Sequence, residues 1–164
     1  TTLMYSLHKR GVIKMSLWMK KLAGKNIMIS GLIASVAMVL IRQIEVVFTM
    51  GYYTDPTNAG LWSTLMMPNA GPPPPEFFVT SLLFTFATGT VLAAVFDFMK
   101  DLLGKGYWRR VIGFTDIMVG LAIVFAYFPM YLMFRVPLGL LIAWSLTSFV
   151  TIFVSAMIYA KRLR

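Results

Sequence analysis

Residues 27–50 read IMISGLIASVAMVLIRQIEVVFTM, an apolar run interrupted by only two charged side chains, Arg42 and Glu45. At 1.5 Å per residue, an α-helix of this length crosses the hydrocarbon core of a bilayer, which is about 30 Å thick. Three further apolar runs of similar length follow, and Pro129 and Pro137 bracket a tight turn between the last two. The sequence therefore predicts an all-α integral membrane bundle of four transmembrane helices, at residues 27–50, 77–99, 111–134 and 136–160.

The composition of the 164-residue chain supports the same fold class. Hydrophobic residues make up 59%, charged residues make up 13% and the mean hydropathy is +0.77, whereas soluble domains carry about 25% charged residues. The absence of cysteine excludes disulfide scaffolds and thiolate chemistry, and a single histidine excludes multi-histidine metal centres. We therefore expect no metal and no cofactor, although bound lipid is expected.

The net charge of +9 indicates orientation and not nucleic-acid binding. Of the fifteen Lys and Arg residues, six precede the first span, four lie between the second and third spans, and three follow the last span. The connection 51–76 contains none. Because cytoplasmic loops are enriched in Lys and Arg, both termini are expected in the cytoplasm. A nucleic-acid binder would instead spread its cations over one solvated face, so no such partner is predicted.

Two segments outside the spans carry further signals. Residues 1–25 form a basic tail, in which residues 12–23 predict an amphipathic helix that lies at the membrane interface. Residues 26–164 then form the four-helix domain. The outer loop, residues 51–76, is rich in proline, and residues 72–75 predict a polyproline II rod. This rod is either a rigid spacer or a ligand for an aromatic groove on another protein.

Four ionisable side chains fall within the spans, where charge is costly and a functional role is the default hypothesis. Arg42 and Glu45 are three residues apart on one helix face, so they can pair. They either line a pathway or form a paired group at a contact with a neighbouring subunit. Asp97 and Asp116 are both expected near the cytoplasmic ends of adjacent antiparallel spans.

This second pair also has two interpretations. Two carboxylates close together can hold a proton or a cation. Alternatively, Arg109 and Arg110 neutralise them in an interfacial salt-bridge cluster. Gly113 and Gly120 flank Asp116 on its own face, which would let another helix approach and bury the acid.

Small hydroxyl residues recur at helical spacing in the second and fourth spans. Such stripes are typical of helix–helix seams in lipid, although a solute pathway could use them as well. Their members are Ser81, Thr85 and Thr88 in the second span, and Ser145, Ser148, Thr151 and Ser155 in the fourth.

No catalytic or phosphate-binding motif is present, so the sequence does not predict an enzyme. Two classes of function remain. The first is a non-catalytic accessory or structural subunit of a larger membrane complex, which includes energy-transducing complexes, with other membrane subunits as partners. The second is a small oligomeric channel or transporter that uses Arg42 and Glu45 together with Asp97 and Asp116.

Overall fold

The computed structural model describes residues 24–58 and 75–163, and every regular element in these ranges is helical. Four helical segments are long and apolar enough to cross a membrane, and α5, η2 and α6 together form one of them. The all-α architecture with four such helices is therefore confirmed. In chain order the elements are α2 (Lys25–Thr54), the 3₁₀ turn η1 (Pro56–Asn58), α4 (Pro75–Met99), α5 (Tyr107–Ala122), the π-helical turn η2 (Ile123–Tyr127), α6 (Phe128–Met133) and α7 (Leu138–Arg162).

Two predicted features lie mostly or wholly outside the described residues. The amphipathic helix at 12–23 is one of them, and the polyproline rod at 72–75 is the other, apart from Pro75, which begins α4. The helices also extend beyond the predicted spans, since α2 continues for one further turn to Thr54 and α5 already begins at Tyr107.

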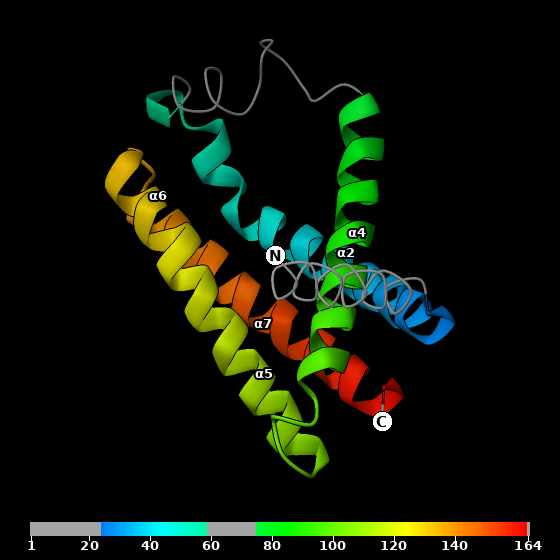
Figure 1. The fold of residues 1–164 in the computed structure, drawn as a ribbon. Helices are drawn as coiled ribbons and strands as arrows, with labels where there is room; N and C mark the ends of the chain where they lie inside the picture. The colour runs from blue at the N-terminus through cyan, green and yellow to red at the C-terminus, as the bar shows by residue number, and fades with distance from the viewer. Residues whose placement is uncertain (1–23, 59–74, 164) are drawn as a thin grey trace, which may run out of the picture.

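α2 and α7 lie at the centre of the bundle and contact most of the other helices. α2 packs mainly against α4 and α7, and α5 packs against α7. Figure 1 shows α5, η2 and α6 continuing as one rod alongside α7, with α4 on the other side of the bundle. The first part of α4 has little cover, because every residue from 76 to 84 is exposed.

Three aromatic rings hold α4, α5 and α7 together. Phe96, Phe114 and Tyr159 are fully buried, with ring centroids between 5.1 and 6.4 Å apart and mostly edge-to-face. Such pairs contribute beyond the apolar area that they bury. The hydroxyl of Tyr159 donates a 2.8 Å hydrogen bond to the carbonyl of Gly89, so the one polar atom of the trio is satisfied.

The contact between α2 and α4 depends on two glycines. A Cβ atom on Gly31 would lie 2.7 Å from the Cα atom of Thr90, and one on Gly89 would collide with the Oγ atom of Ser35. The hydroxyl of Ser35 shares its proton between the carbonyl of Gly31 on its own helix, at 2.7 Å, and the carbonyl of Thr85 across the seam, at 3.1 Å. Close approach at small residues is the usual way that apolar helices associate in lipid.

The predicted turn between the last two spans is present, but Pro129 does not mark it. α6 ends at Met133 and α7 begins after Pro137, whereas Phe128, immediately before Pro129, is helical. The helix widens just before this proline, and the N–H group of Phe128 donates to the carbonyl of Ile123, five residues back. Proline has no backbone N–H group to donate to the helix, and its ring clashes with the carbonyl of the residue four positions earlier. A π-helical turn of this kind relieves that clash and accommodates the proline.

A short polar turn follows α2. The Asp55 carboxylate accepts hydrogen bonds from the backbone N–H and the hydroxyl of Thr57, at 2.8 and 2.7 Å. These two bonds favour the ionised carboxylate and lower the pKa of Asp55 below its usual value.

Candidate functional site: a polar cluster between α2 and α7

Arg42 and Glu45 form the ion pair that their spacing predicts. The Nε atom of Arg42 lies 3.7 Å from the Oε2 atom of Glu45, which is within ion-pair range but beyond hydrogen-bond distance. Glu45 is only 6% exposed, and its Oε1 atom accepts a 2.8 Å hydrogen bond from the hydroxyl of Thr49. Its Oε2 atom is buried and has no hydrogen-bond partner among the described residues.

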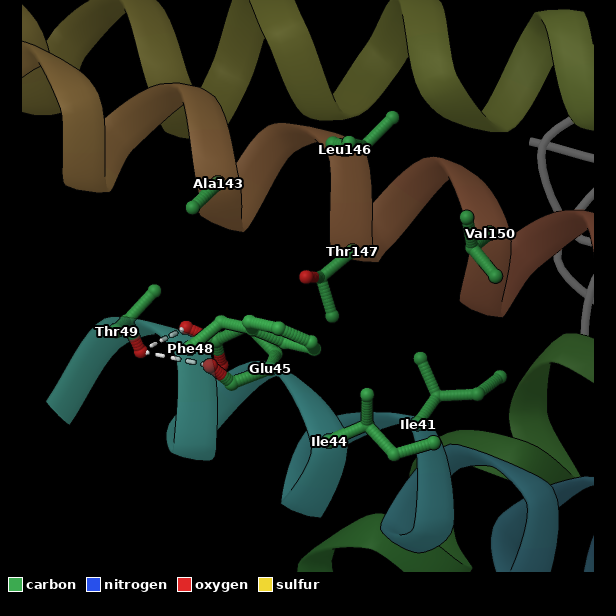
Figure 2. A pocket seen from close by; sticks show the side chains of 9 residues that line it. All are labelled: Ile41, Ile44, Glu45, Phe48, Thr49, Ala143, Leu146, Thr147 and Val150. Atoms are coloured by element: carbon green, nitrogen blue, oxygen red, sulfur yellow. Dashed lines mark hydrogen bonds between the residues drawn. The ribbon is translucent and has the colours of Figure 1, made fainter.

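Glu45 is part of the wall of a groove between α2 and α7. The groove has a volume of about 380 Å³, and Figure 2 shows the two helices supplying its opposite walls. Apart from Glu45, its polar side chains are Thr49 and Thr147, with Thr49 bonded to the acid. The lining consists of Ile41, Ile44, Glu45, Phe48 and Thr49 from α2, and of Ala143, Leu146, Thr147 and Val150 from α7.

Hydrogen bonds continue from this region to the π-helical turn. The indole Nε1 atom of Trp144 donates a 3.0 Å bond to the hydroxyl of Tyr53, which lies two helical turns beyond Glu45. The hydroxyl of Tyr127 bonds the carbonyl of Trp144 at 3.0 Å and also contacts the hydroxyl of Ser148. We call Glu45, Thr49, Tyr53, Tyr127, Trp144 and Ser148 the α2–α7 polar cluster.

The polar cluster fixes the relative position of α2, η2 and α7 at one end of the bundle. Sequence reasoning identified Glu45 and Ser148 but missed the aromatic members. A signal was present for Thr49 and Tyr53, which follow Glu45 at intervals of one helical turn, but not for Tyr127 and Trp144. Among the described residues, no group of three or more His, Cys, Asp or Glu side chains could hold a metal ion.

Asp97 has a different partner from the one that the sequence suggested. Its Oδ1 atom lies 2.8 Å from the Nζ atom of Lys100, which directly follows α4, and Asp97 is 8% exposed. Lys100 also donates a 3.2 Å hydrogen bond to the carbonyl of Leu163 at the end of α7. Of the two predicted neutralising groups, Arg110 bonds the carbonyl of Gly104 instead.

Asp116 lies apart from Asp97. Asp97 faces a pocket between the start of α2 and the end of α7, and no residue of α5 lines that pocket. Phe114 faces the aromatic core, and Asp116, two residues later, is exposed on another side of α5. The two carboxylates therefore do not share one site within the chain.

The hydroxyl stripes are only partly at helix contacts. In α4, Thr85 contributes its carbonyl to the seam with α2, while Ser81 and Thr88 are exposed. In α7, Ser155 is buried, whereas Ser145, Ser148 and Thr151 are half-buried. Four of these seven hydroxyls donate to the backbone carbonyl four residues earlier, so they are not free to bond across to another helix; they are those of Thr85, Thr88, Ser145 and Ser155.

The described residues thus define an all-helical chain with four apolar helices of membrane-spanning length, consistent with a multi-pass membrane protein. Comparison with known proteins assigns no family, since no family model, no curated protein and no solved structure matches the chain.

Proposed function

We propose that the chain crosses a membrane four times, with both termini in the cytoplasm, as a non-catalytic structural subunit of a larger membrane complex. The observation that carries this proposal is the position of Asp116. It lies roughly 14 Å along the helix axis from Tyr107, at 1.5 Å per residue, and its side chain is exposed. An uncompensated charge at membrane depth costs several kcal/mol, so such a group normally faces protein or water.

The described residues provide no partner for this carboxylate. Neither of the ion pairs among them includes Asp116, and no hydrogen bond joins it to another described side chain. The nearest residues on this face are apolar or small: Ile112 and Ile123 are half exposed, and a Cβ atom on Gly120 would meet nothing within 4 Å. A helix of another polypeptide can therefore approach closely here, with a Lys, Arg or amide donor placed opposite the acid.

A second copy of this chain does not offer that donor. A symmetric contact through this face would set one Asp116 against the other, and like charges repel. The other exposed cations of the described helices lie near helix ends, whereas Arg42 lies roughly 26 Å along α2 from Lys25. Measured from the same end of the bundle, Arg42 therefore lies roughly 12 Å deeper than Asp116. In two parallel copies, the Arg42 of one copy and the Asp116 of the other lie at different depths.

A channel or transporter is the competing proposal, and the geometry favours it less. A pathway through one chain would need Arg42 and Glu45 in line with Asp97 and Asp116. The structure brings the first two together, but it places the second two on different sides of the bundle.

The experiment compares Asp116→Asn with Asp101→Asn in the native membrane. Asp101 is an exposed acid in the connection between α4 and α5, so its substitution makes the same change in charge away from the α5 face. After mild detergent extraction, we expect Asp116→Asn to reduce the amount of co-purifying polypeptide by at least tenfold, as expected when a buried interfacial pair is broken. Asp101→Asn should leave it unchanged. Equal recovery from both variants, or solute flux by the purified chain in liposomes, contradicts the proposal.

A further inference from the structure

A second pocket lies at the end of the bundle where α2 begins and where α4 and α7 end. It has a volume of about 350 Å³. Figure 1 shows the start of α2 and the end of α7 on the same side of the molecule. The lining consists of Gly24, Lys25, Asn26 and Ile27 at the start of α2, Asp97 in α4 and Lys100 just after it, and Arg162 and Leu163 where α7 ends.

Three cations from three separate elements converge on this pocket, together with a single acid. Asp97 and Lys100 neutralise each other through their 2.8 Å contact, and Lys100 also bonds the carbonyl of Leu163. Lys25 and Arg162 are both exposed, and neither forms an ion pair with a described residue. The pocket therefore retains two positive charges that nothing within the described residues offsets.

The backbone adds to this positive character. α2 begins at Lys25, and its N-cap residue is Gly24, which has no side chain that could accept a bond from the first N–H groups. The first N–H groups of a helix have no acceptor within the helix, and the aligned peptide dipoles make this end positive. The end of α7 lies at the same pocket, and Lys161 in its last turn and the bond from Lys100 to the carbonyl of Leu163 compensate its negative end.

We propose that this pocket binds the phosphate group of an anionic membrane phospholipid. A phosphate ester carries the one or two negative charges that Lys25 and Arg162 would balance, and basic pockets between transmembrane helices recognise such head groups. Ile27 and Leu163 line the same pocket, and both are buried at the start of the apolar part of the bundle. They make part of the pocket wall apolar, which suits the glycerol and acyl part of a lipid and which a soluble phosphate would not use. The proposal rests on the membrane location proposed above but not on the Asp116 contact.

The test measures retained lipid on the full-length chain in nanodiscs that contain phosphatidylglycerol, by native mass spectrometry after transfer to detergent. Each cation near a phosphate contributes about fivefold to anionic lipid binding. We therefore expect Lys25→Gln and Arg162→Gln each to lower retention about fivefold, and the double variant to lower it about 25-fold. The matched control is Lys105→Gln, an exposed lysine in the nearby connection that does not line the pocket, and it should change retention less than twofold.

Two further arms identify the source of the phosphate. Phosphatidylcholine nanodiscs should leave no specifically retained lipid, because the choline group cancels the phosphate charge. Glycerol phosphate in solution should bind far more weakly than the lipid, because it lacks acyl chains. If it binds as tightly as phosphatidylglycerol, or if phosphatidylcholine is retained equally well, the assignment to an anionic lipid is wrong.

Equal retention by the wild type and the double variant would overturn the proposal, as would an equal loss in the Lys105→Gln control. Helix content measured by circular dichroism shows that each variant has folded. Asp116→Asn should retain lipid like the wild type, so failure of the lipid site and failure of the subunit proposal give different patterns.

Discussion

Replacing Gly31 by alanine tests how α2 and α4 are held together. The added Cβ atom would lie 2.7 Å from the Cα atom and 2.8 Å from the N atom of Thr90. Both of these atoms belong to the backbone of α4, so no side-chain rotation can relieve the collision. The two helices must separate, and the 3.1 Å bond from Ser35 to the carbonyl of Thr85 lengthens with them.

The size of the effect follows from three contributions. Overpacking a close contact costs about 1–3 kcal/mol. Loss of the hydrogen bond across the seam costs about 0.5–1.5 kcal/mol. Alanine is a better helix former than glycine by about 0.5–1 kcal/mol, which opposes the first two. We expect Gly31→Ala to lower the free energy of unfolding by about 2 kcal/mol, a roughly 30-fold change in the equilibrium constant.

Reversible unfolding in mixed micelles, followed by circular dichroism, measures this change. The control is Gly51→Ala on the same helix, where a Cβ atom would meet nothing within 4 Å, so its stability should be equal or higher. Gly89→Ala should lower the free energy of unfolding of the chain, as Gly31→Ala does. The variant with both substitutions should lose less free energy of unfolding than the sum of the two single losses, because the first substitution has already separated the helices. Equal stabilities for Gly31→Ala and Gly51→Ala would refute the reasoning.

Two further predictions concern the turn after α2 and the polar cluster. Because the folded-state pKa of Asp55 is lowered, its bonds to Thr57 are present above the usual pKa of 3.8 and are lost as the pH falls through the lower folded value. The amide proton of Thr57 should therefore titrate with a midpoint below 3.8, and a midpoint at or above this value would contradict the geometry. Trp144→Phe removes the 3.0 Å bond to Tyr53 and should lower the free energy of unfolding by about 1 kcal/mol. Trp108→Phe, at a residue that is 57% exposed, should cost less, and an equal loss would argue against the cluster.

The sequence predicts the helices well because their signal is local. Long apolar runs with few charges favour helices, because a helix satisfies its own backbone hydrogen bonds, and all four helices appear near the predicted positions. The ion pair of Arg42 with Glu45 depends only on a spacing of three residues within one helix. The pairing of Asp97 with Lys100 has the same spacing, and the sequence could have indicated it in place of the arginines of the next helix.

The contacts between helices could not be predicted in the same way. A helix that is apolar on all sides has no pattern that tells which side is buried, so the outward position of Asp116 could not be read from its neighbours. Gly31 and Ser35 form a visible small-residue stripe on α2, but their match with Gly89 depends on how two distant helices align. The bond between Trp144 and Tyr53 could not be predicted either, because the two residues lie far apart in the sequence.

The most direct test of the central claim is the native mass of the particle that contains this chain after extraction in mild detergent. The chain alone has a mass of 18.5 kDa. A subunit whose α5 face is covered by another polypeptide should be recovered in a larger particle, with at least one different chain that a denaturing gel resolves. A particle of 18.5 kDa, or of a whole multiple of this mass with no second polypeptide, would contradict the account.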